Sequence, residues 1–382
     1  MQRISLSSNW QFHLGLIPNG QKFEDQSWRA LDLPHDWSME LPRKAGNPSA
    51  ANGGFFTNGF AWYRKWIDAP PAWKGKKVLI EFEGVYMNAE VWLNGNLLGR
   101  HPYGYTSFCY DLTPHLVIGE KNELRVSVDN ACHKNSRWYS GSGIYRPVWL
   151  WVSSPLHVAH WGIHITTPQV SAGYASVLVH TRVQNETAEG QDVTLRSYIL
   201  APDGVTMATS TSTATLSPNA EHQFSQKTHL PAPALWSPET PRLYQVQCEV
   251  MVDGKMIDSA RQAFGIRSLE IDAQRGLRLN GLPLKLKGGC VHHDNGVLGA
   301  ASYPRAEERK AALLKANGFN AVRCAHNPPA PAFLEACDRL GLLVIEVKGG
   351  NIRYDGATGE WFSGIYAIKD PVLQVTNNRY QL

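Results

Sequence analysis

Residues 319–347 read FNAVRCAHNPPAPAFLEACDRLGLLVIEV, and this stretch decides the fold of the C-terminal third of the chain. A short apolar run is followed by a Pro-rich turn, a helical pattern and a second apolar run. The segment before it, 304–318, opens on Pro, carries two Glu in its first turn and closes on Gly, which indicates another helix. Strands that alternate with helices predict a parallel sheet with crossover helices.

Residues 1–154 show the alternation of apolar and polar residues that is typical of β-strands. Ile80 and Phe82 share one face of an alternating run, and Glu81 and Glu83 share the other. An Asn-Gly pair between apolar flanks predicts a two-residue hairpin, and further short strands are separated by Gly, Pro and Asn turns. This pattern favours a β-sandwich, with a jelly roll as the expected variant.

Residues 155–267 repeat the strand pattern at regular spacing, with Asp203-Gly204 and Asp253-Gly254 as turns. About seven strands in a segment of this length are typical of an immunoglobulin-like sandwich, although the Cys, Trp and Cys that pin many such domains are missing. The Pro-rich segment 230–241 is expected to be an irregular crossover between strands.

The composition excludes several classes of protein. The chain has 382 residues and a formal net charge of +4 without any block of Lys and Arg, which argues against nucleic-acid binding. There is no apolar run long enough for a membrane helix and no signal-like N-terminus, so a cytoplasmic location is expected. The six cysteines are scattered, which favours reduced thiols over disulfides or a zinc site.

Polar clusters follow two of the predicted parallel strands. His292, His293 and Asp294 follow the first, and Arg323 with His326-Asn327 follow the second. In a (β/α)₈ barrel such positions face the reaction centre. Because neighbouring residues of a strand point to opposite sides, only one of the two adjacent histidines can face the mouth.

Two other interpretations of these clusters remain open. The histidines could be buried structural residues and the arginine an ion-pair partner. A metal site formed by His292, Asp294 and His326 is chemically possible, but no further acidic ligand follows at a helpful spacing, so no metal or other cofactor is expected.

Several segments together resemble the β-galactosidase branch of glycoside hydrolase family two. They are LPHDW, SRWYSGSGIYRPVWL, LWSPETPRLY, FGIR, KGGCVHHDNGVLGAA and NGFNAVRCAHNPPAPAFLEACDRLGLLVI. The resemblance implies a mainly β, multidomain fold with an incomplete (β/α)₈ TIM barrel at its end. The expected parts are a sugar-binding jelly roll (1–154), an immunoglobulin-like sandwich (155–267), the first barrel units (268–347) and an unassigned tail (348–382).

The resemblance also implies a sugar site. His326 is similar to the sugar-contacting histidine of the family's R-x-x-H-x-P stretch, and the segment with His292 and Asp294 is similar to one that lines the same pocket. A jelly-roll loop leans over the barrel mouth in relatives, and two residues here match it. The candidate carbohydrate-binding set is Arg137, Trp138, His292, His293, Asp294, Arg323, His326 and Asn327.

The glutamates of the C-terminal part leave no catalytic pair. Glu307 and Glu308 are expected on the exterior of a helix and Glu335 on a helix surface, while Glu360 falls in the tail. Glu346, at a strand end, is then the one carboxylate expected at the mouth. Retaining hydrolysis needs two positioned carboxylates, so no catalytic residue is assigned.

The chain therefore resembles a truncated or frame-shifted family member, because relatives continue the third strand with Asp-Glu where Glu346-Val347 stands here. The alternative functions are a non-catalytic carbohydrate-binding fragment, a fragment that complements a separate barrel part, and a structural remnant without a ligand. A homo-oligomer is also possible, whereas nucleic-acid and membrane partners are not expected.

Overall fold

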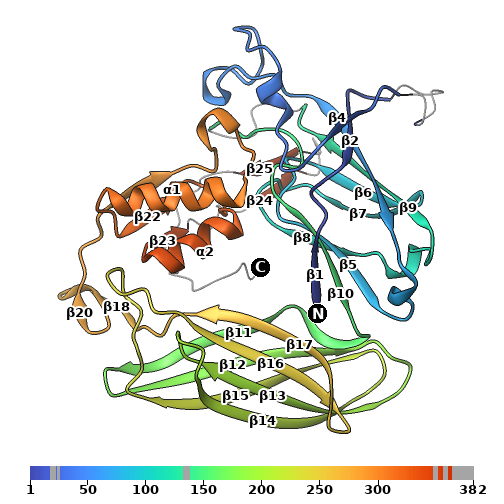
Figure 1. Ribbon diagram of the computed structural model, residues 1–382. Coiled ribbons are helices and arrows are strands. Elements are labelled where there is room, and N and C mark those ends of the chain that lie inside the picture. The colour runs from blue at the N-terminus through green and yellow to red at the C-terminus, as the bar shows by residue number, and fades with distance from the viewer. Residues whose placement is uncertain (18–22, 24–25, 132–137, 347–351, 356–359, 364–382) are drawn as a thin grey trace.

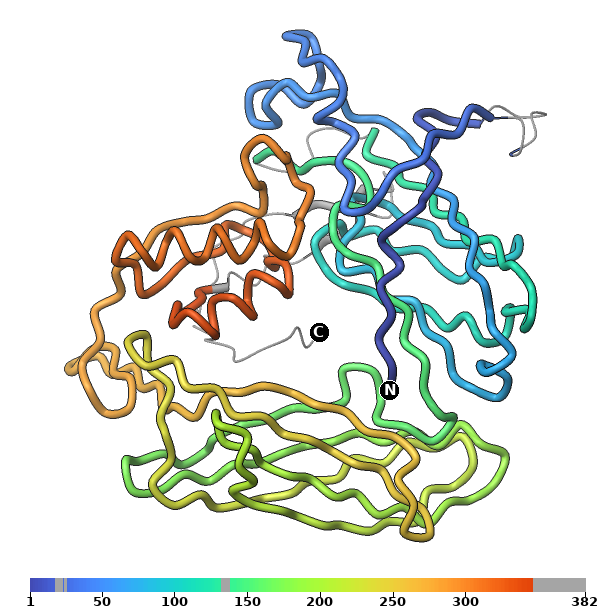
Figure 2. Tube along the Cα trace, viewed as in Figure 1, coloured from blue at the N-terminus to red at the C-terminus, as the bar shows by residue number. Residues whose placement is uncertain are grey.

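The computed structural model describes residues 1–17, 23, 26–131, 138–346, 352–355 and 360–363. Two β-sandwiches and one α/β body lie around a common centre (Figure 1 and Figure 2). In Figure 1 the first sandwich runs from blue to green, the second from green to yellow, and the α/β body from orange to red. This order confirms the predicted fold class. Within the described residues, no helix has the length and apolar character needed to cross a membrane.

The first sandwich pairs a four-stranded sheet with a six-stranded sheet. In spatial order the four strands are β1 (Gln2–Ser5), β10 (Val148–Ser153), β5 (Lys77–Phe82) and β8 (Phe108–Asp111). The six are β3 (Arg29–Leu31), β2 (Trp10–Leu14), β4 (Phe60–Asp68), β9 (Lys121–Asp129), β6 (Ala89–Leu93) and β7 (Asn96–His101). Short 3₁₀ turns connect them: η2 (Trp37–Glu40), η3 (Ala51–Gly53), η4 (Pro71–Trp73) and η5 (Thr113–His115).

The alternation of β5 places its apolar side chains in the core and its acids outside the sandwich. Ile80 and Phe82 are fully buried in the apolar cluster between the sheets. Glu81 and Glu83 face the other way, where strands usually meet water. Both are nevertheless buried, at 5% and 3% exposure. Arg3 and the Trp149 and Trp151 indoles of the same sheet pack on them. His160 of the second sandwich lies beside Glu81.

The second sandwich has the predicted seven strands in two sheets. One sheet is β11 (Leu156–Ser171), β12 (Tyr174–Asn185) and β15 (Ala220–Pro231); the other is β14 (Thr206–Leu216), β13 (Gln191–Leu200), β16 (Tyr244–Val252) and β17 (Lys255–Phe264). Asp253 and Gly254 both have positive φ at the turn between β16 and β17, as a two-residue hairpin requires.

The α/β body begins with a small antiparallel sheet of β18 (Leu269–Asp272), β19 (Gly276–Leu279) and β20 (Leu282–Pro283). The parallel unit follows, in the order β21 (Gly288–Val291), η6 (Gly296–Leu298), α1 (Pro304–Ala316), β22 (Ala321–Cys324), α2 (Pro331–Leu340) and β23 (Leu343–Glu346). A separate pair, β24 (Ile352–Asp355) and β25 (Glu360–Ser363), is antiparallel and falls in the segment that the sequence left unassigned.

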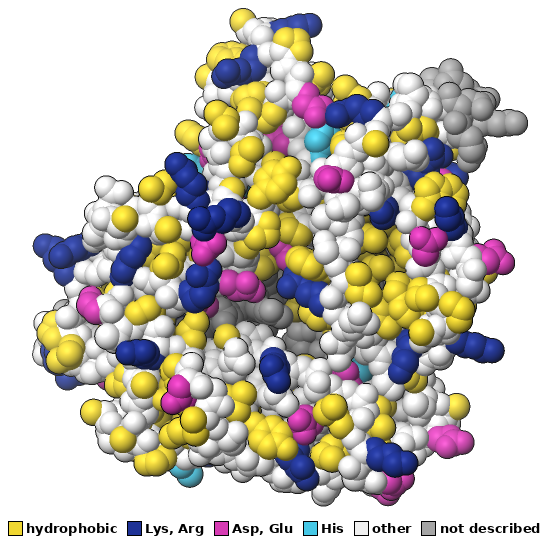
Figure 3. Space-filling view, viewed as in Figure 1, with side chains coloured by type: hydrophobic (Ala, Val, Ile, Leu, Met, Phe, Trp, Pro, Cys, Tyr) yellow, Lys and Arg dark blue, Asp and Glu magenta, His cyan; other side chains and the backbone are white. Residues whose placement is uncertain are grey.

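The crossover predicted for the Pro-rich segment also contacts the α/β body. The Trp236 indole donates to the carbonyl of Asp338 at 2.8 Å, and Lys315 Nζ donates to the carbonyl of Pro238 at 2.6 Å. Gly341 ends α2 with φ +78 and lies so close to Pro238 that a Cβ there would overlap its carbonyl. These contacts fix the second sandwich against α2. Figure 3 shows a hollow where the three domains meet, with charged side chains of both signs around it.

Candidate functional site

The two predicted polar clusters come together at one edge of the parallel sheet. β21 and β22 are in register, with Val291 opposite Cys324, so the residues after each strand leave the sheet side by side. The rings of His292 and His326 lie 6.0 Å apart and are nearly perpendicular. This edge, at the carboxyl ends of the strands, is the candidate site.

His292 is covered by an aromatic ring from the first sandwich. Trp138 stacks on its imidazole with 4.2 Å between ring centroids and 13° between planes. The same indole donates a hydrogen bond to Asp294 Oδ1 at 3.1 Å. Trp138 stays 45% exposed, so it forms a wall that remains open to solvent.

The surroundings of His292 lower its pKa below the ordinary value. Burial is the largest cause, and Arg323 and Lys310 act in the same direction, while Asp294 and the backbone of Ala325 oppose them. The imidazole is therefore neutral at neutral pH. A neutral ring can both donate and accept a hydrogen bond, which suits a hydroxyl ligand.

His293 points away from the mouth, as strand alternation predicts for one of the pair. Its Nε2 lies 3.0 Å from the Ser140 carbonyl, and its ring meets Tyr105 and Tyr145 edge to face. Burial is the largest cause that lowers its pKa to about 4, so the ring is neutral and donates to the carbonyl. The structure places His293, which the sequence grouped with the sugar-binding residues, at the contact between two domains.

Arg323 and His326 contact each other at the end of β22. Arg323 Nη2 lies 3.4 Å from His326 Nδ1, and its Nη1 lies 3.5 Å from Cys290 Sγ. Because a guanidinium can only donate, His326 Nδ1 accepts, and a neutral His326 carries its proton on Nε2. The arginine thus fixes which nitrogen of His326 can donate to a ligand.

The loop after β22 is fastened to the first sandwich. Asn327 Oδ1 accepts from the Tyr103 hydroxyl at 3.0 Å. The fully buried Arg146 donates to the carbonyls of Pro328 at 2.8 Å and Tyr105 at 2.9 Å. Sequence patterns indicated neither contact, since each joins residues far apart in the chain.

Asp36, in the LPHDW segment, makes a second contact between the first sandwich and the barrel, which the sequence did not predict. One carboxylate oxygen accepts from the Ser142 amide at 2.9 Å, and the other accepts from the Ala300 amide at 2.8 Å and from the Tyr139 hydroxyl. Burial is the main cause that raises the pKa of Asp36, and its hydrogen bonds oppose this. The side chain joins the loop that carries Trp138 to the barrel loop that carries His292.

Two glycines permit this close approach of the loops. Gly141 has φ +73, and an added Cβ would overlap Ala300. Gly299 has φ +61, and an added Cβ would overlap Met39. Both lie in segments that carry the family resemblance, which is the one signal in the sequence that could have pointed to them.

Glu307 differs from its predicted place on the exterior of a helix. It is only 2% exposed, and its Oε1 accepts from Asn295 and Ser302, both at 2.8 Å. Its Oε2 pairs with Lys310 at 3.1 Å, and Lys310 also contacts the carbonyl of His292. A helix start is exterior only where no loop folds back over it, and here the loop after β21 does so.

The remaining residues singled out in the sequence lie either outside the described part of the chain or on the surface of a helix. Arg137 and the side chain of Glu346 lie outside the described residues. Glu335 is exposed on α2 as expected, and Glu308 pairs with Arg305 and Arg339 on the helix surface. Across the described part of the chain, no group of three or more His, Cys, Asp or Glu side chains is arranged to hold a metal ion.

Three models of one family match successive parts of the chain. Residues 4–154 match the sugar binding domain of glycosyl hydrolases family 2, 156–267 match the domain named for the family, and 270–352 match its TIM barrel domain.

Among curated relatives, a protein named beta-galactosidase BoGH2A from Bacteroides ovatus is 44% identical over 347 residues, which are 90% of this chain and 41% of that protein. A putative beta-glucuronidase from Formosa agariphila is 37% identical over 90% of this chain and 33% of its own length.

Solved structures agree with these relatives. A family 2 glycosyl hydrolase from Bacteroides cellulosilyticus has a TM-score of 0.88 at 42% identity, covering 94% of this chain and 48% of that one. A beta-glycosidase from Bacteroides vulgatus has a TM-score of 0.83 at 39% identity, covering 91% and 44%. The chain spans less than half the length of these relatives, and it belongs to glycosyl hydrolase family 2.

Proposed function

We propose that the chain is the N-terminal part of a retaining glycoside hydrolase that acts on β-galactosides or related β-glycosides, and that its barrel mouth binds the sugar. One observation carries the proposal: polar side chains from two strand ends converge beside an aromatic wall from another domain. The proposed sugar contacts are Trp138, His292, Asp294, Arg323, His326 and Asn327.

These groups suit a polyhydroxylated ring. Trp138 offers an apolar face beside an open volume, and sugar rings carry apolar C–H faces that pack on indoles. The proton on His326 Nε2 can be donated to a hydroxyl oxygen, and the Asp294 carboxylate can accept a hydroxyl proton. The mouth can therefore orient a sugar.

Turnover by this chain alone is not expected. Retaining hydrolysis needs two carboxyl groups about 5–5.5 Å apart, one as acid and one as nucleophile. The described barrel supplies three parallel strands and two helices, whereas a closed barrel needs eight of each. The purified chain should show no hydrolysis of an aryl β-galactoside or aryl β-glucuronide at any pH. Hydrolysis that copurifies with the chain and survives mutation of Glu346 would contradict this.

Sugar binding at the mouth can be measured without turnover. Saturation-transfer NMR with methyl β-galactoside and methyl β-glucuronide should show binding of one glycoside, and His326→Ala should weaken it. The control variant is His222→Ala, because His222 is an exposed histidine on β15 of the second sandwich. Binding that His326→Ala leaves unchanged, or binding of neither glycoside by the native chain, would contradict the proposed site.

A complementing role has separate support. The groove between α1 and the loop after β21 is apolar, and Val297, Leu298 and Leu313 there are 91%, 40% and 46% exposed. Parallel sheets are normally covered on both faces, and their edge strands are normally paired or covered. We expect the C-terminal part of the Bacteroides ovatus relative, made separately, to coelute with this chain on gel filtration. Leu313→Glu should prevent it, whereas coelution with a second copy of this chain would indicate a homo-oligomer instead.

A further inference from the structure

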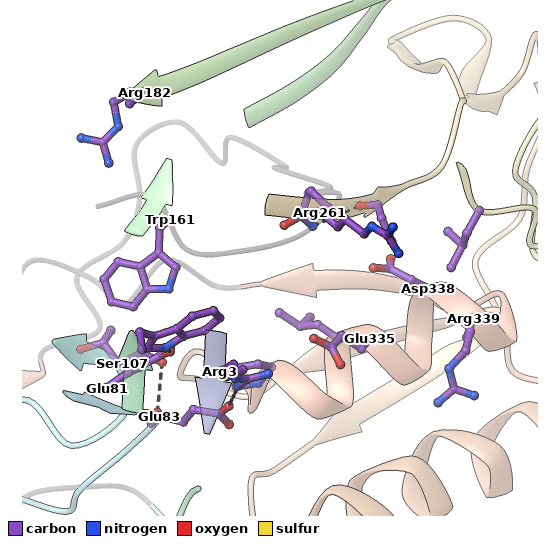
Figure 4. A pocket seen from close by; sticks show the side chains of 17 residues that line it. Arg3, Glu81, Glu83, Ser107, Trp161, Arg182, Arg261, Glu335, Asp338 and Arg339 are labelled. Atoms are coloured by element: carbon purple, nitrogen blue, oxygen red, sulfur yellow. Dashed lines mark hydrogen bonds and ion pairs between the residues drawn. The ribbon is translucent and has the colours of Figure 1, made fainter. Parts of the chain in front are cut away.

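A cavity of about 590 Å³ lies where the three domains meet, apart from the barrel mouth. Its walls come from the outer face of the β1–β10–β5–β8 sheet, from β11 and β17 of the second sandwich, and from α2 (Figure 4). None of its lining residues belongs to the proposed sugar contacts at the mouth. Its size is within the range of about 300–1,000 Å³ that small-molecule sites occupy.

One wall holds two buried carboxylates in fixed positions. The Trp151 indole donates to Glu81 Oε2 at 2.7 Å. The Trp149 indole at 2.7 Å and Arg3 Nη2 at 2.8 Å both donate to Glu83 Oε1. Each acid also has a basic partner: Arg3 pairs with Glu83, and His160 Nε2 lies 3.6 Å from Glu81 Oε2.

The facing wall presents an aromatic ring. Trp161 lies at a bulge of β11, where the register with β12 shifts between Val158 and Ile163, and its φ is +52. This conformation is unfavourable for a bulky residue. The indole is 37% exposed and lines the cavity (Figure 4). The indole is thus placed in the cavity by a strained backbone conformation.

Charged side chains of both signs line the cavity. There are four arginines and four acids, and the raised pKa of Glu83, about 7, leaves that acid partly protonated at neutral pH. On the side opposite the buried acids, Arg182 and Arg261 come from the second sandwich and Arg339 from α2. A strongly charged ligand would meet repulsion from one half of the lining, whereas a neutral ligand with many hydroxyls could donate to the carboxylates and accept from the guanidiniums.

We propose that this three-domain cavity binds a neutral saccharide, at a site separate from the barrel mouth. The sugar packs a C–H face on Trp161, its hydroxyls donate to Glu81 and Glu83, and Arg261 donates to its oxygens. Because the lining comes from all three domains, the bound sugar also stabilises their arrangement. The site has no catalytic role and does not depend on the activity proposed for the mouth.

Isothermal titration of the full chain with maltose, isomaltose and trehalose tests this, because these neutral sugars are joined by α-linkages and are not the β-glycosides proposed for the mouth. At least one disaccharide should bind in the millimolar range, and Trp161→Ala should weaken it by about tenfold, since loss of one stacked aromatic ring has roughly that effect. Glu83→Gln should weaken it as well. Trp66→Ala removes an indole of similar exposure on β4, and His326→Ala alters the mouth; both should leave the affinity unchanged.

Several outcomes would overturn the proposal. No heat from any of the three sugars at tens of millimolar would remove it. Binding that Trp161→Ala leaves unchanged, or that His326→Ala abolishes, would place the sugar elsewhere. Tighter binding of glucuronic acid or glucosamine than of the neutral sugars would refute the neutral class. Thermal unfolding of Trp161→Ala should match that of the native chain, because a half-exposed ring on a bulge contributes little core packing.

Discussion

Glu83→Gln should make the protein more stable at pH 8, and the gain should shrink to less than about 1 kcal/mol at pH 5. Burial is the largest cause that raises the pKa of Glu83 to about 7, and repulsion from Glu81 adds to it. Arg3, the Trp149 indole and Arg146 oppose the rise. Gln has the shape of the protonated acid and keeps an oxygen that accepts from the arginine and the indole.

The sign and size follow from proton linkage. The ordinary pKa is 4.5 and the folded pKa is about 7, so between these values the folded state holds a proton that the unfolded chain has lost. The free energy of unfolding therefore falls as pH rises through this window, and the full loss is present above pH 7. At 1.36 kcal/mol for each pH unit, the loss amounts to about 3 kcal/mol, which Glu83→Gln should recover at pH 8.

Urea unfolding of the native chain and the variant at pH 5, 6, 7 and 8 measures this. Subtracting one free energy of unfolding from the other cancels the groups that titrate equally in both proteins. Glu239→Gln, at an exposed loop position, is the matched control and should run parallel to the native chain. A constant difference between Glu83→Gln and the native chain from pH 5 to 8 would show that Glu83 does not titrate as described.

Three further predictions concern the contact between the first sandwich and the barrel. Asp36→Ala leaves three buried backbone N–H groups and a hydroxyl without their acceptor. Urea unfolding should therefore show that the free energy of unfolding falls by roughly 3 kcal/mol or more. A fall below about 1 kcal/mol would contradict the contact. Gly299→Ala should destabilise the protein more than Gly204→Ala in thermal unfolding, since both have positive φ but only the first meets neighbouring atoms. Trp138→Ala should weaken glycoside binding at the mouth by saturation-transfer NMR without lowering the melting temperature, because the half-exposed indole covers His292 but little core.

Features that depend on the local pattern of residue types were predictable from the sequence. The hairpin at Asn94-Gly95 joins β6 and β7 with positive φ at both residues, as that pair of residue types indicates. Helices α1 and α2 fall at the segments whose Pro, Glu and Gly positions predicted them. The meeting of His292 with His326 was also predictable, because parallel strands bring their carboxyl ends to one edge.

Features set by contact between domains were not predictable. Alternation assigns Glu81 and Glu83 to one face of a strand, but it cannot say whether water or another domain covers that face. Glu307 sits at a helix start that looks exterior until the loop after β21 folds over it. For Asp36, nothing within its own segment shows that a barrel loop about 260 residues later supplies an amide to it.

The same contacts between domains should determine how strongly the mouth binds a sugar. Trp138 and Tyr103 come from the first sandwich, whereas His292 and Asn327 come from barrel strand ends. A barrel alone would present the histidine without its aromatic wall and the asparagine without its hydroxyl partner. We therefore expect sugar affinity at the mouth to depend on the hydrogen bonds of Asp36 as well as on the histidines themselves. Asp36→Asn keeps one acceptor oxygen, so its sugar affinity and its free energy of unfolding should lie between those of the native chain and of Asp36→Ala.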